Sequence, residues 1–345
     1  MKKEMDRRKF LKKTGAGALG IALGSGQLIG MPAIHSSKLR AFKQINGVQL
    51  GCITYSFRSL KDQSAEATLQ YVKESGINAI ELMGDPAESF AGMPQSEINR
   101  MRMWMLGRKQ RSGEELTADE KMELEEMRKE MEDYQLRVQQ WRAQADMKPF
   151  EQLKKMYHDE GVMIYAFKPA AFGKNNLDAE INYGMRAAKA LGASHVTLEH
   201  PSDDDHTLKL GNMAASNGVK VAYHGHEQQV FNFWDTALKQ SAANTLNLDA
   251  GHYIAAGNKD LFPLLEKQHS RIMSMHLKDR QTPENGKGNV LWGTGDTPIP
   301  DILKMMQRNK YTFPGTIELE YQIPEDSDPV KEVQKCLAFC ELALK

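Results

Sequence analysis

Short apolar runs alternate with longer segments of helical periodicity along most of the chain. The apolar runs have the length of buried β-strands, and glycines such as Gly192 and Gly218 close several helical segments. We expect strands at residues 48–54, 78–83, 162–167, 194–199, 219–224, 244–249, 272–277 and 315–321. We expect helices at residues 65–75, 178–191, 207–216, 260–267, 301–309 and 330–344. This alternation indicates a parallel sheet with right-handed crossovers.

Eight strands is the number that closes a (β/α)8 barrel. We therefore predict an α/β fold, a TIM barrel over residues 46–345. A doubly wound open sheet is the structural alternative. No Gly-x-Gly-x-x-Gly phosphate loop follows the first strand, which counts against the dinucleotide-binding form of that alternative.

One segment, residues 95–148, separates the second and third strands by far more chain than a crossover helix needs. It holds two long helical patterns, the second starting at the capping-box sequence Thr117-Ala118-Asp119-Glu120. We predict a long helical-hairpin insertion between strands two and three. Its mixed charges suit a solvated surface. Its departure from the end of strand two equally suits a lid over the site, or an arm that joins a homo-oligomer.

The N-terminus differs from the rest of the chain. Basic residues between Asp6 and Lys13 precede an apolar, Gly/Ala-rich run over residues 14–31, an order typical of a secretory signal. The run is too short and too glycine-rich for a membrane span. The Arg7-Arg8-Lys9-Phe10-Leu11-Lys12 core resembles a twin-arginine export signal. We expect residues 1–35 to be a signal peptide. The protein should then be periplasmic or otherwise exported by the twin-arginine route. We expect no integral membrane segment in the mature chain. A basic tail beside a chance apolar run is the alternative.

The overall charge adds little evidence for a macromolecular partner. The 345 residues carry 45 basic and 45 acidic side chains, so nothing in the composition favours nucleic acid or an anionic membrane. The three cysteines, Cys52, Cys336 and Cys340, form no Cys-x-x-Cys site and no disulfide framework. We therefore expect no nucleic-acid partner.

Titratable residues gather where the expected strands end. Asp249 ends the sixth strand and His252 follows three residues later, so both can face one metal ion. In a closed barrel such strand ends ring a single pocket. The groups are Glu81, Lys168, Glu199, His224, His226, Asp249, His252, His276, Lys278, Asp279, Glu318 and Glu320. Each alone is more often a cap or an ion pair, but together they are hard to satisfy except around a cation and a polar ligand. We expect one divalent metal ion, Mn²⁺, Co²⁺, Zn²⁺ or Mg²⁺.

At these residues the sequence resembles the xylose isomerase-like, or sugar phosphate isomerase/epimerase, superfamily of TIM barrels. The resemblance is carried by residues 223–226, 248–252, 276–279 and 315–320. It implies that Asp249, His276 and Glu320 bind the metal. Many members have a glutamate at the end of strand five, where this chain has His224. The fourth ligand is therefore either His224 or Glu199 of strand four.

The resemblance also implies a reaction, the removal of a proton beside a sugar carbonyl through a metal-stabilised enediolate. The candidate catalytic residues are Glu199, Glu320, His226 and Lys168. The candidate substrate-binding residues are Glu81, His252, Lys278 and Asp279. Glu320 or Glu199 would act as the base, with His226 as the alternative.

The leading functional hypothesis is a metal-dependent isomerase or epimerase of a non-phosphorylated sugar or keto-sugar, because export would separate the enzyme from cytoplasmic sugar phosphates. A 3-keto-glycoside lyase would use the same enolisation to expel the group at the anomeric carbon. A non-catalytic sugar-binding barrel is the third hypothesis. A nuclease of the endonuclease IV kind would need three metals and histidines on the early strands. The expected strands one to three offer none.

Overall fold

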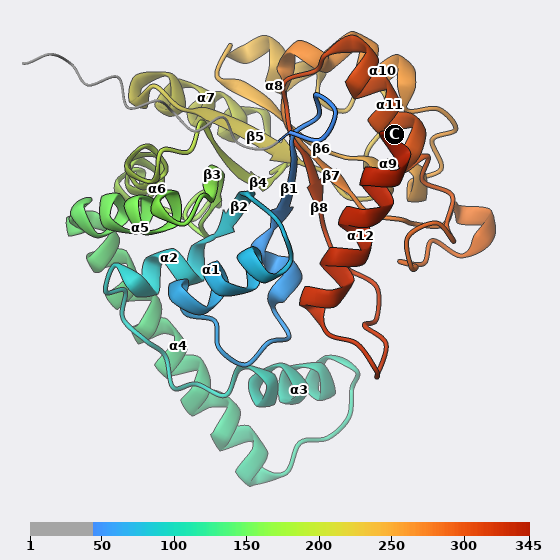
Figure 1. Cartoon of the computed structure of the whole chain (residues 1–345). Helices are drawn as coiled ribbons and strands as arrows, with labels where there is room; N and C mark the ends of the chain where they lie inside the picture. Colours follow the sequence, from blue (N-terminus) through green and yellow to red (C-terminus); the bar gives the residue numbers. More distant parts are fainter. Residues whose placement is uncertain (1–43) are drawn as a thin grey trace, which may run out of the picture. The chain divides into compact units, whose positions relative to one another are not determined.

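Eight parallel strands close into a barrel in the computed structural model, which describes residues 44–345. The strands follow one another in sequence order, and β1 pairs with β8 to complete the circle (Figure 1). The strands are β1 Leu50–Ile53, β2 Ala79–Met83, β3 Met163–Lys168, β4 His195–Glu199, β5 Lys220–His224, β6 Asn244–Asp249, β7 Ile272–Leu277 and β8 Gly315–Ile317. The predicted α/β barrel is thus confirmed, although β8 stops at Ile317 and not at residue 321. The predicted signal peptide, residues 1–35, lies outside the described residues.

Helices connect successive strands and cover the barrel. They are α1 Ala65–Glu74, α2 Gly84–Phe90, α3 Arg100–Arg111, α4 Ala118–Gln144, α5 Lys148–Asp159, α6 Asp178–Leu191, α7 Asp204–Asn217, α8 Asp235–Gln240, α9 Ala250–Ala255, α10 Phe262–Gln268, α11 Ile299–Asn309 and α12 Pro329–Ala343. The described residues also hold the short 3-10 helices η2 Thr54–Phe57, η3 His269–Arg271 and η4 Pro283–Asn285. No helix in this part of the chain has the length and apolar character that a bilayer crossing requires.

Local sequence signals explain where the helices begin and end. The side chains of Ser64, Asp203 and Asp328 each accept a hydrogen bond from a backbone N–H in the first turn of α1, α7 and α12. Gly192 and Gly218 end α6 and α7 with positive φ angles of 78° and 69°. The strands between these helices are largely buried, as expected for a parallel sheet covered by helices. Cys336 and Cys340 are both buried, consistent with a packing role.

The helices α3 and α4 occupy the segment for which the sequence predicts an inserted hairpin (Figure 1). Thr117 and Glu120 form the expected capping box at the start of α4. The last part of α4 is anchored to the barrel helices through Arg142, which is buried. Its guanidinium lies 3.0 Å from Glu88 of α2 and 3.3 Å from Glu180 of α6.

Candidate metal centre

Three neighbouring strands bring His224, Asp249 and His276 together at their carboxyl ends. All three side chains are buried, and their candidate ligand atoms lie within 4.8 Å of one another. The His224 Nε2 atom is 3.9 Å from Asp249 Oδ2, and the His276 Nδ1 atom is 3.7 Å from the same oxygen. Asp249 and His276 are register partners on β6 and β7, which fixes this proximity. The arrangement offers two imidazoles and a carboxylate to one point.

The His224 ring is held in the tautomer that metal ligation needs. Its Nδ1 atom lies 2.8 Å from the amide oxygen of Asn247, which only accepts, so Nδ1 carries the hydrogen. Burial holds the pKa of His224 well below its usual range, so the ring is neutral. The Nε2 lone pair therefore faces Asp249, as in histidines whose second nitrogen is fixed by a hydrogen bond.

The His276 ring lies between two buried carboxylates. Its Nδ1 atom is 2.8 Å from Glu318 Oε2, and its Nε2 atom is 2.8 Å from Glu81 Oε2. Burial alone would lower the pKa of His276, but the charges of Glu318 and Glu81 outweigh it and raise the pKa to about 10. Glu81 is itself fixed by Thr197 and Asn247, at 2.6 Å and 3.1 Å. Glu81, a predicted substrate ligand, thus contacts the site through His276 from a fully buried position.

The two carboxylate oxygens of Asp249 have different surroundings. Its Oδ1 atom accepts the backbone N–H of His252 at 2.6 Å and so caps α9, which begins directly after β6. Its Oδ2 atom is buried and accepts no hydrogen bond of normal geometry from any described residue. A buried carboxylate oxygen left in this state beside two imidazoles fits a cation.

The ammonium group of Lys278 lies against the same oxygen. Lys278 Nζ is 3.0 Å from Asp249 Oδ2, 2.6 Å from Glu318 Oε2 and 2.9 Å from Glu320 Oε2. Burial would lower the pKa of Lys278, but the three carboxylates raise it above its usual value. His224, Asp249 and the neighbouring acids therefore fit a divalent ion, and His276 would join them by giving up the Nδ1 proton that it shares with Glu318, in a site where Lys278 shares the carboxylates.

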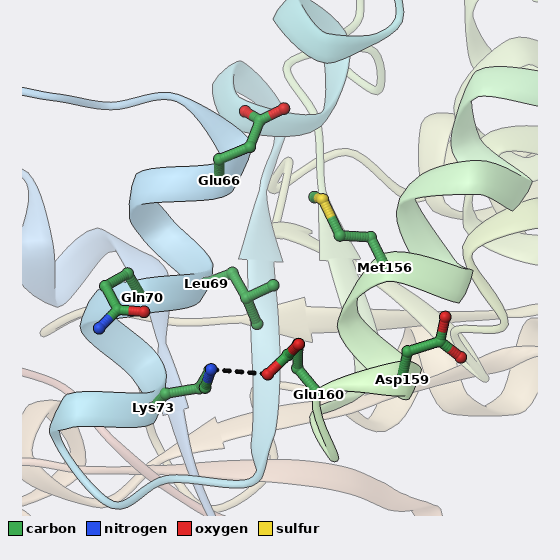
Figure 2. A pocket seen from close by; sticks show the side chains of 7 residues that line it. All are labelled: Glu66, Leu69, Gln70, Lys73, Met156, Asp159 and Glu160. Atoms are coloured by element: carbon green, nitrogen blue, oxygen red, sulfur yellow. Dashed lines mark hydrogen bonds and ion pairs between the residues drawn. The ribbon is translucent and has the colours of Figure 1, made fainter.

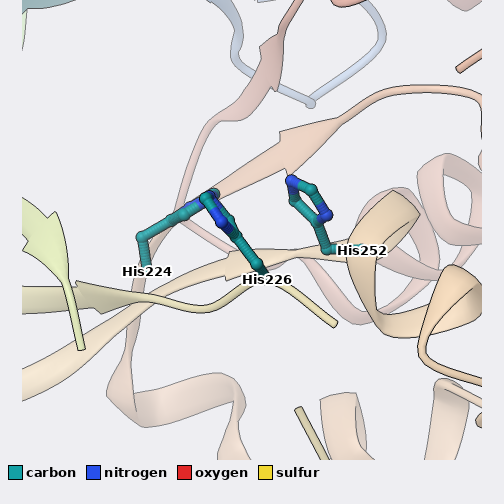
Figure 3. A group of neighbouring side chains, drawn as sticks. All are labelled: His224, His226 and His252. Atoms are coloured by element: carbon teal, nitrogen blue, oxygen red, sulfur yellow. The ribbon is translucent and has the colours of Figure 1, made fainter. Parts of the chain in front are cut away.

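A second group of imidazoles shares His224 with this centre (Figure 3). His224, His226 and His252 also offer ligand atoms within 4.8 Å of one another, and the rings of His226 and His252 stack with centroids 4.4 Å apart. His226 is exposed, whereas His252 is buried and its Nδ1 accepts a hydrogen bond from Arg280. Burial, reinforced by the charge of Lys278, lowers the pKa of His252 to about 3. His252 is therefore a neutral ring at the edge of the centre.

The acids Glu199 and Glu320 lie farther out, and neither belongs to the candidate metal groups of the described residues. Glu199 is exposed and lies 3.1 Å from Lys168 and 3.3 Å from His226. Glu320 lies 2.9 Å from Lys278 and 3.7 Å from His252. Of the two residues that compete for the fourth ligand position, His224 and not Glu199 lies beside Asp249. Metal binding by Glu199 and Glu320 stays a prediction.

Asp279, predicted to bind substrate, contacts the loop that follows β7. Its oxygens accept backbone N–H groups of Gly293, Gly295 and Thr297 at 2.8, 2.9 and 3.2 Å. Burial raises the pKa of Asp279 although these donors oppose the shift. These contacts order the loop, and a role in substrate binding remains a prediction.

Two residues without a predicted role, Glu318 and Asn247, contact the candidate ligands. Glu318 pairs with Lys278 and also contacts His276, and Asn247 contacts His224. Each lies two residues before a candidate ligand, Asn247 before Asp249 and Glu318 before Glu320. Because alternate residues of a strand point to one face, this spacing was the signal that could have identified both.

One cavity adjoins the outer edge of the centre. It measures about 540 Å³ and is lined by Lys168, Phe172, Glu199 and other residues at the ends of β3 and β4. It shares Ala170 and Asn176 with a cavity of about 570 Å³ beside α4. A third cavity, of about 340 Å³, lies between α1 and α5 beside the Lys73–Glu160 ion pair (Figure 2). None of the candidate site residues lines this third cavity.

Solved structures with this barrel fold match the chain at low sequence identity. A sugar phosphate isomerase/epimerase from Parabacteroides distasonis is 16% identical with a TM-score of 0.53, covering 86% of this chain and 94% of its own. The probable 3-DHS dehydratase AsbF from Bacillus anthracis is 13% identical with a TM-score of 0.55, covering 84% and 99%. The IOLI protein with a binding zinc atom is 14% identical with a TM-score of 0.53, covering 86% and 98%. No curated protein matches the chain in sequence. The family model described as xylose isomerase-like TIM barrel matches residues 69–340, and the chain therefore belongs to that family.

Proposed function

We propose that this protein is a divalent-metal-dependent enzyme that isomerises or epimerises a non-phosphorylated sugar or keto-sugar through an enediolate. The observation that carries the proposal is the convergence of His224, Asp249 and His276 at the carboxyl end of the barrel, the end where TIM-barrel enzymes have their active sites. The sugar phosphate isomerase/epimerase among the structural neighbours supports the reaction class, and the neighbour with a binding zinc atom supports the metal.

The residues around the centre have distinct parts in the proposed reaction. A bound metal would supply Lewis-acid polarisation of the substrate carbonyl. Glu320 beyond β8 and the Glu199–His226 pair at the ends of β4 and β5 come from opposite sides of an eight-strand barrel. One of these groups takes the proton from the carbon beside the carbonyl. If the same group returns the proton to the neighbouring carbon, the result is isomerisation. If the group on the opposite side gives a proton to the other face of the same carbon, the result is epimerisation.

The cationic and neutral side chains orient the substrate in this scheme. Lys168, beside Glu199, can hold a hydroxyl or a developing oxyanion at the edge of the 540 Å³ cavity. Neutral His252 offers its Nε2–H to a substrate oxygen, since its Nδ1 is occupied by Arg280. Together these groups bind the sugar at two points around the carbon that loses its proton.

Deuterium exchange tests the proposal directly. The Mn²⁺-loaded protein is incubated with free sugars and 3-keto-sugars in heavy water, and NMR measures deuterium at the carbon beside the carbonyl. We expect exchange with the wild type and with Asp301→Asn, a control on the exposed face of α11. Asp249→Ala should lose both metal binding and exchange while its circular dichroism stays unchanged. Metal-independent exchange, or full activity of Asp249→Ala, would contradict the proposed centre. Sugar binding without any exchange would favour a non-catalytic barrel.

A second candidate function is a 3-keto-glycoside lyase. The 540 Å³ cavity beside Lys168 and Glu199 favours it, because it offers space beyond a single sugar ring for a second group. A dehydratase among the structural neighbours is consistent with elimination after enolisation. Release of the aglycone from 3-keto-glycosides would identify the lyase, and turnover of free sugars alone would exclude it.

A further inference from the structure

The insertion forms an arm with a small core of its own. We define the arm as residues 100–133, which comprise α3, the connection and the first part of α4. Leu106, Leu116 and Leu124 are buried together in it, away from the main core. Only later residues of α4, including Arg142, contact the barrel helices through buried ion pairs. Figure 1 shows α3 and the start of α4 lying apart from the strands of the barrel.

The arm exposes large apolar side chains on one face of α3. Met101 is 66% exposed, Trp104 52% and Met105 45%, and their spacing of three and four residues places them side by side. On α4, Met122 is 62% exposed. Adjacent exposed side chains of this size, one of them tryptophan, are typical of a protein–protein contact.

Charge complementarity identifies the partner. Helix α3 carries five basic residues and no acid, whereas residues 114–133 carry ten acidic and three basic residues. Within the arm, Arg102 pairs with Glu123 and Lys109 with Glu120. The remaining charges leave a positive helix beside a negative one. An anionic membrane would attract α3 but repel residues 114–133, whereas a second arm, rotated by a two-fold axis, offers each helix its opposite.

We propose that the arm is a self-association surface, and that α3 of one protomer docks against α4 of a second copy with Trp104 near the centre. In such an isologous interface each charged contact occurs twice, so the charge pattern acts on both sides of the axis. The inference is independent of the proposed reaction, since it concerns residues that the candidate metal centre does not use.

Sedimentation velocity and light scattering on the full chain, with a monomer mass of 38.9 kDa, measure the association. We expect a dimer at micromolar concentration whose dissociation constant rises with salt, because exposed charges are screened. Trp104→Glu should raise the dissociation constant at least ten-fold. Leu342→Glu, at an equally exposed position on α12 outside the arm, should leave it unchanged. Thermal melts establish that both variants are folded.

A charge-swap pair tests the orientation. Arg108→Glu/Arg111→Glu should not self-associate, because it places two acidic side chains of each α3 against the acidic α4 of the second copy. Glu126→Lys/Glu130→Lys should fail because it places two basic side chains of each α4 against the basic α3. All four positions are exposed. Mixing the two double variants should restore a heterodimer, since both contacts then join opposite charges. A monomeric wild type at 100 µM (about the upper end of the assay), a dimer that survives Trp104→Glu, binding to anionic vesicles in its place, or a mixture without heterodimer would each overturn the proposal.

Discussion

Replacement of Lys278 by methionine should strengthen metal binding. The Lys278 ammonium forms ion pairs of 2.6 to 3.0 Å with Asp249, Glu318 and Glu320 in a buried position. Any divalent ion bound by Asp249 must compete with this ammonium for the same Oδ2 atom. Methionine keeps the length and the apolar stem of the side chain but removes the charge. The variant therefore separates competition for the carboxylates from packing.

The size of the effect follows from the buried ion pairs. A metal ion that binds Asp249 must break the buried ion pair between Asp249 and Lys278, and breaking a buried pair costs about 3–5 kcal/mol. The remaining ion pair of Lys278 with Glu320 offsets only part of this cost. Taking the low end, about 3 kcal/mol corresponds to a roughly 100-fold change in the dissociation constant. The metal-free Lys278→Met variant should also lose about 3 kcal/mol of unfolding free energy, because Asp249 is left as an uncompensated buried charge and Glu318 keeps only His276 as a partner. Metal should restore this loss.

Isothermal titration with Mn²⁺ and Zn²⁺ measures the affinity, and urea unfolding with and without metal measures the stability. Lys267→Met is the control, since Lys267 pairs with Asp235 away from the candidate ligand group. We expect the control to bind metal with unchanged affinity. An equal or weaker affinity of Lys278→Met would refute the reasoning, because it would mean that the ammonium and the metal do not share these oxygens.

Three further substitutions test other parts of the structure. Asn247→Leu removes the acceptor that fixes the His224 tautomer, so metal affinity should fall about 10- to 100-fold in titration while the fold is kept. Arg142→Met leaves the buried Glu88 without this ion pair, so urea unfolding should show a loss of about 3–5 kcal/mol. Arg7→Lys/Arg8→Lys should retain the protein in the cytoplasm on fractionation if the export prediction is right.

The barrel could be predicted because its strands and helices repeat a simple alternation. Each expected strand overlaps an observed one, since parallel strands buried on both faces read as continuous apolar runs. The short helices α8 and α9, six residues each, escaped prediction because they are too short to show helical periodicity. The early end of β8 was not predicted either. Polar and apolar residues alternate in Glu318-Leu319-Glu320, and this pattern is the same whether or not the backbone is paired in the sheet.

The candidate site could be predicted only in its outline. The strand ends identified Asp249 and His276, because topology alone gathers them at one end of the barrel. The proximity of His224, and not Glu199, to Asp249 depends on the side-chain directions, which the sequence does not contain. The position of Lys278 among three carboxylates required them too, because a lysine two residues after a histidine reads equally well as a substrate ligand or as an internal counter-ion.

This centre departs from a simple four-ligand site in two ways, through His224 at the end of β5 and through Lys278 among the carboxylates. The charges of the centre connect these two features. The superfamily that the sequence resembles often has a glutamate where β5 ends in neutral His224, so this chain lacks one negative charge there. Asp249, Glu318, Glu320 and Glu81 supply four negative charges, and Lys278 and protonated His276 supply two positive charges. A divalent ion that displaced the His276 proton would leave one excess negative charge, whereas a glutamate in place of His224 would leave two in a buried site, which is costly. His224 and Lys278 are therefore mutually consistent features of one candidate metal centre.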